Sequence, residues 1–434
     1  MSARILHADG KDFAAAYDAL LAQRGARLDA AEAQARPVVE DVRRRGVAAV
    51  LEAAERFDRV RLAPADLRVS QTAINRARQA CAPDLLAALE LAAARIQDFH
   101  ARQKPKDALW TDAAGMRLGW RWSAVDACGL YAPGGLAAYP SSVLMNAGPA
   151  KAAGVRRLAM ATPPGRIEAN PAILAAAEIA GVDEIWAVGG AQAIAALAYG
   201  AGDLAPCDVV VGPGNAYVAA AKKIVFGDVG IDAVAGPSEV FILADGSCPP
   251  DWIAADLLAQ AEHDAEAQSV LFTQHENFAA AVAAAVEAQL QAGLAGASAR
   301  ESWTRHGAII LVASLEAACA LIDRAAPEHV QIALEDEAGA DALAQRIRHA
   351  GAIFLGARAP EALGDYLAGP SHVLPTSRAA RYASGVNVLT FMKRTTLIGA
   401  DARAIGLLGP PAARIADAEG LPAHAHSLRV RLEP

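Results

Sequence analysis

The side chains with the clearest chemical potential lie in four short segments of the 434-residue chain. In the first, Gln260 and His263 stand three positions apart in a run whose apolar residues recur at helical spacing, so both side chains leave one face of a predicted helix. Imidazole nitrogen is the commonest protein ligand of transition metals, whereas an amide oxygen is a weak ligand that its surroundings must hold in place. Taken alone, the pair is more typical of a surface or hydrogen-bonded histidine than of a metal site.

The second segment places a carboxylate beside an imidazole at Glu328 and His329, directly before the predicted strand 330–332. Glutamate and histidine differ by about two units in reference pKa, and burial shifts either pKa, so the pair could supply two bases with different tasks. A helix C-terminal turn that ends in an unreactive histidine fits the same pattern equally well.

The remaining two segments put polar groups on loops. Asp365 and His372 lie in a stretch shaped by glycine and proline, and Glu419, His424 and His426 lie near the C-terminus. One carboxylate and two imidazoles together with a helical amide could form a zinc shell with room for a substrate. That shell would combine Gln260, His263, Asp365 and a tail histidine, but ligands so widely dispersed give a weak spacing signal.

The elements that must position these groups predict an α/β fold with two Rossmann-like parallel-sheet domains. Residues 11–103 read as helices, and from residue 157 onward buried strands alternate with amphipathic helices. The predicted strands are 157–162, 184–188, 208–211, 240–243, 269–272, 308–312, 330–333 and 353–355. Beyond residue 377 the alternation is lost, and segments 409–411 and 419–422 carry turn chemistry typical of an extended C-terminal tail.

Three glycine-rich loops, at 129–135, 189–190 and 212–215, fall where a parallel sheet binds ligands. A helix follows the last loop at once, so its N-terminus could meet a pyrophosphate. The loop lacks the third glycine of the dinucleotide fingerprint, and no acidic residue follows the next strand to hold a ribose. Nucleotide binding and tight turns without a ligand therefore both remain open. The polar side chains best placed to contact a cofactor are Tyr131, Gln192 and Asn215.

Composition narrows the class of protein. The hydrophobic fraction of 54% is inflated by alanine, and no apolar run is long enough to span a bilayer. The first residues show no signal or transit pattern, which predicts a cytoplasmic protein, and a net charge of −8 argues against nucleic acid as a partner. The five cysteines are scattered, and Cys128, the only one near a motif, is expected to be buried and unreactive.

Taken together, the motifs resemble the histidinol dehydrogenase family. They occur in that family's order, cover nearly the whole chain, and comprise residues 129–147, 211–218, 230–239, 260–263, 327–329, 364–366, 372–375 and 419–424. The resemblance implies an aldehyde/histidinol dehydrogenase-like fold. Its parts would be an N-terminal helical segment (1–25), a first α/β domain carrying the metal and catalytic residues (26–128 and 239–377), a second, NAD-binding α/β domain (129–238) and a tail exchanged in a dimer (378–434).

The resemblance further implies a zinc-containing, NAD-dependent enzyme, with one zinc per subunit, that oxidises L-histidinol through L-histidinal to L-histidine at the end of histidine biosynthesis. Carried over residue by residue, Glu328 and His329 match the paired proton acceptors, and Tyr131, Gln192 and Asn215 match cofactor contacts. The zinc ligands would be Gln260, His263, Asp365 and His424, and the substrate contacts Ser238, Gln260, His263, His329, Asp365, His372, Glu419 and His424. The family is a homodimer whose tail reaches the partner's site, so Glu419 and His424 would act across the interface.

Two departures from the family pattern and three alternatives accompany this expectation. Ser371 stands where the family usually has asparagine, and Asp264 and Ala265 replace the more usual glycine and proline. A related dehydrogenase of another small hydroxylated substrate, such as a sulfonated diol, would keep the fold. A cysteine route through Cys128 would trap the aldehyde covalently. A non-catalytic binding protein would be expected to lack the pair at 328 and 329.

Overall fold

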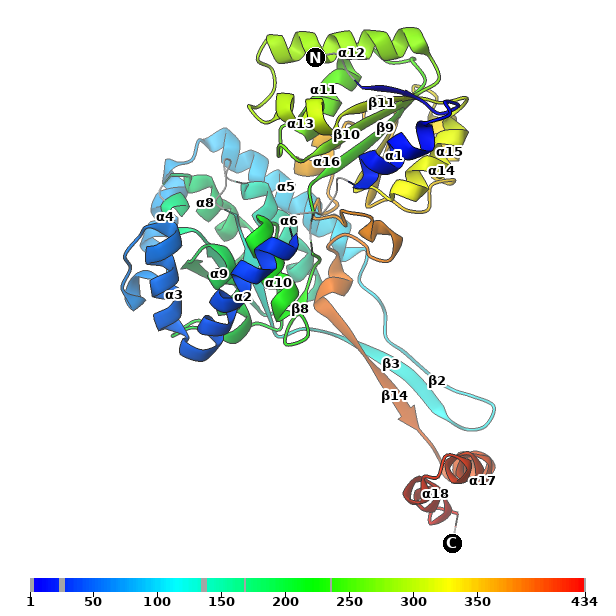
Figure 1. The fold of residues 1–434 in the computed structure, drawn as a ribbon. Coiled ribbons are helices and arrows are strands. Elements are labelled where there is room, and N and C mark those ends of the chain that lie inside the picture. The colour runs from blue at the N-terminus through cyan, green and yellow to red at the C-terminus, as the bar shows by residue number, and fades with distance from the viewer. Residues whose placement is uncertain (1–3, 23–27, 134–138, 168, 235, 433–434) are drawn as a thin grey trace.

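Two parallel β-sheets organise the chain, and an antiparallel ribbon leads from them to the C-terminal helices (Figure 1). The computed structural model describes residues 4–22, 28–133, 139–167, 169–234 and 236–432. The expectation of an α/β fold with two parallel sheets is confirmed. Within the described residues, no helix is both long and apolar enough to cross a membrane.

The first sheet has six parallel strands in the order β1-β11-β10-β9-β12-β13. Its central strands carry apolar side chains on both faces, so helices must cover both. Helices α1, α14 and α15 cover one face, and α11, α12 and α13 cover the other. The strands are β1 (Ile5–His7), β9 (Glu239–Ala244), β10 (Gln268–Thr273), β11 (Ala308–Leu311), β12 (His329–Ala333) and β13 (Ala352–Leu355). The helices are α1 (Phe13–Ala22), α11 (Pro250–Ala261), α12 (Glu276–Gln291), α13 (Ala299–His306), α14 (Leu315–Ala325), α15 (Glu337–Ala344) and α16 (Glu361–Tyr366).

The second sheet has five parallel strands in the order β6-β5-β4-β7-β8. Helices α2, α3, α9 and α10 share one core with it, and α4, α5, α6 and α8 share the other. The strands are β4 (Ala127–Tyr131), β5 (Arg157–Thr162), β6 (Glu184–Ala187), β7 (Val209–Val211) and β8 (Gly230–Ile231). The helices are α2 (Leu28–Arg45), α3 (Val47–Ala53), α4 (Gln71–Ala80), α5 (Pro83–Ala101), α6 (Pro140–Ala153), α7 (Pro164–Ile167), α8 (Pro171–Ile179), α9 (Gly190–Tyr199) and α10 (Ala216–Val225).

The N-terminal third packs differently from the expected domain division. Val39 of α2 lies in one core with Ile194 of α9, and Ile96 of α5 lies in another with Leu144 of α6. Residues 28–101 therefore share the two cores of the second sheet. The first segment is also not purely helical, because β1 pairs in parallel with β11 at the edge of the first sheet.

An antiparallel ribbon of three strands, β14-β3-β2, carries the tail away from both sheets (Figure 1). Strands β2 (Ala108–Thr111), β3 (Arg117–Ala124) and β14 (Met392–Gly399) make it, with β14 paired to β3 from Met392 to Gly399. Two helices follow, α17 (Ala402–Ala418) and α18 (Pro422–Arg429), and they pack on each other through Ala413, Ala416 and Ala425.

The turn expected at 409–411 is wrong, because Pro410 and Pro411 lie inside α17. A proline ring clashes with the carbonyl four residues earlier and removes one helical hydrogen bond. Here burial of Ala413 and Ala416 against α18 supports the helix on the far side of the prolines. The turn expected at 419–422 is present, since α17 ends at Ala418 and Gly420 takes a φ of +69°.

The expected glycine loop at 129–135 is wrong in its first part. Gly129 and Tyr131 belong to the buried strand β4. A Cβ at position 129 would lie 3.0 Å from the Leu197 side chain of α9, so the glycine permits close helix packing and does not mark a turn. Residues 134–138 of the expected loop lie outside the described residues.

Candidate functional site

The ionisable and amide side chains of the first sheet's candidate site lie at the amino ends of β9 and β12. His329 opens β12 and pairs in register with Val240, one residue into β9. Helix α11 runs back from β9, so its last residues, including Gln260, return to this same edge. Helix α16 follows β13 and brings Glu361 and Asp365 on one face, four residues apart. Residues that are more than one hundred positions apart in sequence thus meet at one edge.

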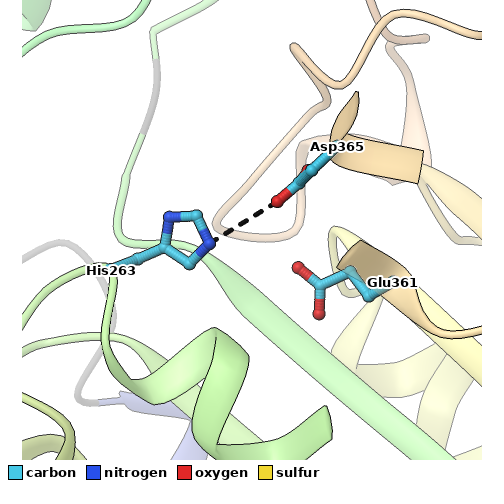
Figure 2. Close-up of side chains that lie close together, drawn as sticks. All are labelled: His263, Glu361 and Asp365. Carbon is cyan, nitrogen blue, oxygen red and sulfur yellow. Dashed lines mark ion pairs between the residues drawn. The ribbon is translucent and has the colours of Figure 1, made fainter. Parts of the chain in front are cut away.

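A cluster of side chains that could hold a metal ion occupies this edge (Figure 2). His263 Nε2 lies 3.6 Å from Asp365 Oδ2, and ligand atoms of His263, Glu361 and Asp365 all lie within 4.8 Å of one another. Gln260 is completely buried beside Glu361, whose side chain is 3% exposed. Two of these residues, His263 and Asp365, match sequence expectations, whereas Glu361 does not appear among them.

The expectation that His263 lies within the helix of Gln260 is wrong, because α11 ends two residues before His263. Helix α11 ends at Ala261, with Glu262 as its C-cap, and His263 follows it. Asp264, which departs from the family pattern, accepts a hydrogen bond from the Glu266 backbone N–H at 2.9 Å. This Asx turn ends the helix. His263 nevertheless remains beside the face of Gln260, and its N–H donates to the Gln260 carbonyl at 3.3 Å.

Asp365 is held by two imidazoles. His263 approaches one of its oxygens, and His372 Nδ1 lies 3.6 Å from the other and 3.1 Å from the Asp365 backbone carbonyl. Burial works to raise the pKa of Asp365, but the hydrogen bonds of His263 and His372 outweigh it, and the pKa falls well below its usual value. The aspartate is therefore an anion. His372 Nε2 also lies 3.1 Å from the hydroxyl of Ser142 on α6, which ties the first sheet's site to the second domain.

The pair Glu328 and His329 is buried, with side-chain exposures of 8% and 5%. Glu328 accepts a hydrogen bond from the Glu239 backbone N–H at 3.0 Å, and His329 Nδ1 lies 3.1 Å from the Glu239 carbonyl oxygen. A carbonyl only accepts, so Nδ1 carries the proton and Nε2 is left as a base. Burial lowers the pKa of His329 to about 4, which keeps the ring neutral. Burial also raises the pKa of Glu328 well above its ordinary value, against hydrogen bonds from Glu239 and Ser238.

The charge at this edge is unbalanced in favour of anions. Glu328, Glu361 and Asp365 are three neighbouring carboxyl groups, and burial followed by the charges of Asp365 and Glu328 raises the pKa of Glu361. The charged neighbours that could offset them are histidines. Buried carboxylates are normally paired with cations or metal ions. A divalent cation held by an imidazole, an amide and a carboxylate fits this donor set.

The three expected cofactor residues lie at the carboxyl ends of the second sheet's strands. The Tyr131 hydroxyl, at the end of β4, accepts a hydrogen bond from the Gly190 N–H at 3.0 Å, and burial raises the pKa of Tyr131 to about 12. Gln192 Nε2 donates to Asp58 Oδ2 at 3.1 Å. Asn215 caps α10 by accepting from the N–H groups of Tyr217 and Val218 at 3.1 and 3.2 Å. Carboxyl strand ends are where such sheets bind nucleotides.

The turn after β7 is fixed by a buried ion pair. Lys222 and Asp232 are 3% and 1% exposed and contact each other. Lys222 donates to the Gly212 carbonyl at 2.9 Å, and Asp232 accepts from the Gly212 N–H at 2.9 Å. Gly212 takes a φ of +122°, and a Cβ there would lie 2.2 Å from the Tyr131 carbonyl oxygen. The glycine is thus required by the backbone of the neighbouring strand.

Glu419 and His424 do not join the site of their own chain. Both are exposed, Glu419 as the C-cap of α17 and His424 within α18. Figure 1 shows these helices at the far end of the β14 ribbon, away from α11 and α16. His426 is exposed on the same helix.

Sequence reasoning missed Glu361, Ser142 and Asp58. Glu361 lies four residues before Asp365, and that helical spacing was the one signal that could have found it. Ser142 and Asp58 reach their partners across 230 and 134 positions, so no local pattern indicated them. Ser371, the second departure from the family, is buried and donates its N–H to His100 Nε2 at 3.1 Å.

The expectation that Cys128 is buried is confirmed. Its side chain has no exposed surface, and burial followed by the charge of nearby Cys207 raises the pKa of its thiol well above the ordinary value. The other four cysteines are also free and buried. A thiolate at Cys128 is therefore strongly disfavoured, and the cysteine route has no structural support.

Comparison with known proteins gives a consistent result. A family model described as histidinol dehydrogenase matches residues 21–432. A relative from Caulobacter vibrioides, histidinol dehydrogenase, is 53% identical over 429 residues, covering 99% of both chains. The histidinol dehydrogenase of Rhodospirillum rubrum is 56% identical over 430 residues, covering 98% of both. The crystal structure of histidinol dehydrogenase from Elizabethkingia anophelis superposes with a TM-score of 0.90 at 34% identity, covering 99% of this chain and 98% of that one.

Proposed function

The chain belongs to the histidinol dehydrogenase family, and from this premise we propose that it oxidises L-histidinol through L-histidinal to L-histidine with NAD. The observation that carries the proposal is the buried pair Glu328 and His329 beside the cluster of His263 and Asp365. Two oxidations of one carbon need a base for the alcohol and a base for a water. This edge offers both within one anionic site.

Zinc fits the donor set, and Gln260, His263 and Asp365 would hold it, one per subunit. An amide oxygen, an imidazole and a carboxylate are three of the four protein ligands, and His424 of the partner subunit would be the fourth. Zinc, when bound, would orient the imidazole and amine of histidinol and polarise them. The surrounding carboxyl groups favour a cation at this position.

His329 is the proposed base of the first oxidation. Its Nδ1–H is held by the Glu239 carbonyl, so Nε2 carries the lone pair that can accept a proton. Because burial lowers the pKa of His329 to about 4, the ring is neutral and can take the hydroxyl proton. The hydride from the same carbon goes to NAD, which is the electron acceptor when bound.

Glu328 is the proposed base of the second oxidation, in which a water adds to the aldehyde and the hydrate loses a second hydride. Burial raises the pKa of Glu328 well above its ordinary value, and a carboxylate with a raised pKa is a stronger general base. Its hydrogen bonds with the Glu239 N–H and with Ser238 fix the carboxyl group beside His329. Ser238 and His372 would contact the substrate at the border of the site.

Tyr131, Gln192 and Asn215 are the proposed cofactor contacts. The Tyr131 hydroxyl already accepts one hydrogen bond and keeps its own proton to donate, because its pKa is about 12. Asp58 sets the direction of the Gln192 amide. The positive end of the α10 helix dipole after Asn215 favours a phosphate.

We further propose a homodimer in which α17 and α18 reach the partner's site. Ile398, Leu407 and Ile415 are 72%, 58% and 62% exposed on the β14 ribbon and α17, and such apolar surface fits an interface. Glu419 and His424 would complete the substrate and zinc sites of the partner subunit. The cytoplasm is the proposed location.

The test is NADH formation from L-histidinol by purified protein, measured before chelation, after chelation and after zinc is restored. The proposal predicts that activity is lost on chelation, returns with zinc, and yields two NADH for each histidine formed. A metal-loaded protein that binds NAD but forms no NADH from histidinol would contradict the substrate assignment. Other amino alcohols and diols, including a sulfonated diol, would then be screened.

A further inference from the structure

Glu361 is a buried carboxyl group that the proposed ligands and bases leave without a task. It opens α16 and is 3% exposed. Its Oε1 lies 3.4 Å from His329 Nδ1, whose proton is directed to the Glu239 carbonyl. Burying a carboxyl group among Glu328 and Asp365 is unfavourable, so its retention at this position calls for a specific partner.

That partner is the amide of Gln260. The two ends of an amide have nearly the same shape, and its hydrogen-bond partners decide which way it lies. With Nε2 turned toward Glu361, the amide donates to Oε1 at 2.9 Å and to Oε2 at 3.3 Å. In the opposite orientation the Gln260 side-chain oxygen faces the Glu361 oxygens, and neither can donate a hydrogen bond. Gln260 is completely buried, so no water competes for its N–H groups.

We infer that Glu361 is a positioning residue that takes the Nε2 hydrogens of Gln260 and thereby turns the Gln260 oxygen toward His263 and Asp365. The inference rests on the proposed zinc site. An amide nitrogen has no lone pair to offer a metal, so Gln260 is a ligand in only one of its two orientations. Carboxylate partners of metal ligands serve this purpose elsewhere, and their removal weakens metal binding about 10–100-fold.

Glu361 as a direct zinc ligand is the competing assignment, since its oxygens lie within 4.8 Å of ligand atoms of His263 and Asp365. With the Gln260 Nε2 turned toward Glu361, however, both Glu361 oxygens accept from the one amide. A divalent cation beside the cluster favours the ionised form of Glu361, which only accepts hydrogen bonds. If Glu361 positions Gln260, its effect on zinc affinity depends on the Gln260 amide. If Glu361 is a direct ligand, its effect does not depend on that amide.

The first measurement is zinc affinity by chelator competition, without reference to turnover. Glu361→Gln keeps the size of the side chain. It presents the Gln260 amide with one acceptor oxygen and one donor nitrogen in place of two acceptor oxygens. We expect zinc to bind about 10–100-fold more weakly. Glu262→Gln is the matched control, because Glu262 is the C-cap of α11 and adds a nearby negative charge while binding the Gly296 N–H. The zinc affinity of the Glu262→Gln protein is expected to differ from that of wild type by less than about threefold.

The second measurement repeats Glu361→Gln in a Gln260→Glu background. A carboxylate at 260 has no wrong orientation, and it is repelled by Glu361. Positioning therefore predicts that Glu361→Gln now raises zinc affinity, because an amide N–H replaces a like charge. Direct ligation predicts a loss in both backgrounds, and that result overturns the inference.

The failure of the proposed function would look different. Wild-type protein that holds no zinc at this cluster contradicts the metal site itself, whereas equal affinity of wild type and Glu361→Gln contradicts only the role of Glu361. Circular dichroism of each variant, and the swapped Gln260→Glu, Glu361→Gln pair in which the hydrogen bond is kept, separate loss of folding from loss of positioning.

Discussion

The two nitrogens of His329 have different surroundings, and this asymmetry predicts separable effects of its neighbours. Replacing His329 with Asn removes the base of the first oxidation, so kcat for histidinol should fall about 10²–10⁴-fold with zinc content unchanged. Glu328→Gln should slow the second oxidation more than the first, because it removes the base that activates water. The NADH formed per histidinol consumed would then fall from two toward one. Equal slowing of both steps in Glu328→Gln would contradict this division of tasks.

The burial of His329 also predicts how stability depends on pH. Its pKa is about 4 in the folded protein against 6.5 in an unfolded chain. Below pH 6.5 the unfolded chain takes up a proton that the folded one refuses, so stability is full above this pH and is lost as pH falls toward 4. A shift of this size corresponds to about 3 kcal/mol.

Urea unfolding of metal-free protein at pH 7 and pH 4 would measure this loss of stability. Wild type should lose about 3 kcal/mol more than His329→Gln over this range. The other titrating groups at the edge, Glu328, Glu361, Asp365, His263 and His372, are common to both proteins and largely cancel. Equal losses of the free energy of unfolding in wild type and His329→Gln would show that His329 is not held neutral by burial.

Among the elements, the turn between β7 and α10 depends on an ion pair that no surface feature indicates. Lys222→Met removes the cation that contacts the buried Asp232 and leaves its hydrogen bond from the Gly212 N–H. Its free energy of unfolding should fall by about 3–5 kcal/mol. Adding Asp232→Asn removes the Asp232 charge but keeps an acceptor for Gly212, so the double variant should be more stable than Lys222→Met alone. Additive losses in urea unfolding would contradict coupling of the pair.

The regular elements were predictable from the sequence because their hydrophobic pattern is local. The strands expected at 157–162 and 269–272 are β5 and, with one more residue at each end, β10. Their side chains are buried on both faces, and such runs bounded by turns indicate parallel strands. The alternation of strand and helix therefore sufficed to predict two parallel sheets.

Other features depend on packing that the local pattern does not contain. Gly129 resembles a loop residue but serves the approach of α9, and β14 is an exposed strand whose partner β3 is more than 260 positions away. Residues 28–101 carry ordinary amphipathic stripes, which show that a helix packs but not on which sheet. The candidate site was largely anticipated through family motifs. Glu361 and Asp58 were missed because each acts by holding another side chain.

At the scale of the whole molecule, the separation of the tail from its own site predicts complementation between subunits. A His424→Ala chain and a His329→Asn chain should each be nearly inactive. Mixed and refolded together, they would form some dimers with one intact site, which takes its tail histidine from one chain and its base from the other. Recovery of up to about a quarter of wild-type activity per total subunit is expected from random pairing. Mixtures as inactive as their parents would contradict a site shared across the interface.

The long ribbon that carries His424 away from the cluster would tie metal retention to protein concentration. In the proposed arrangement each zinc ion is held by two chains. Zinc binding therefore strengthens dimerisation, and dimerisation strengthens zinc binding by the same factor. Dilution would loosen zinc, and scarce zinc would loosen the dimer. The abundance of the enzyme would then help to determine what fraction of it is active.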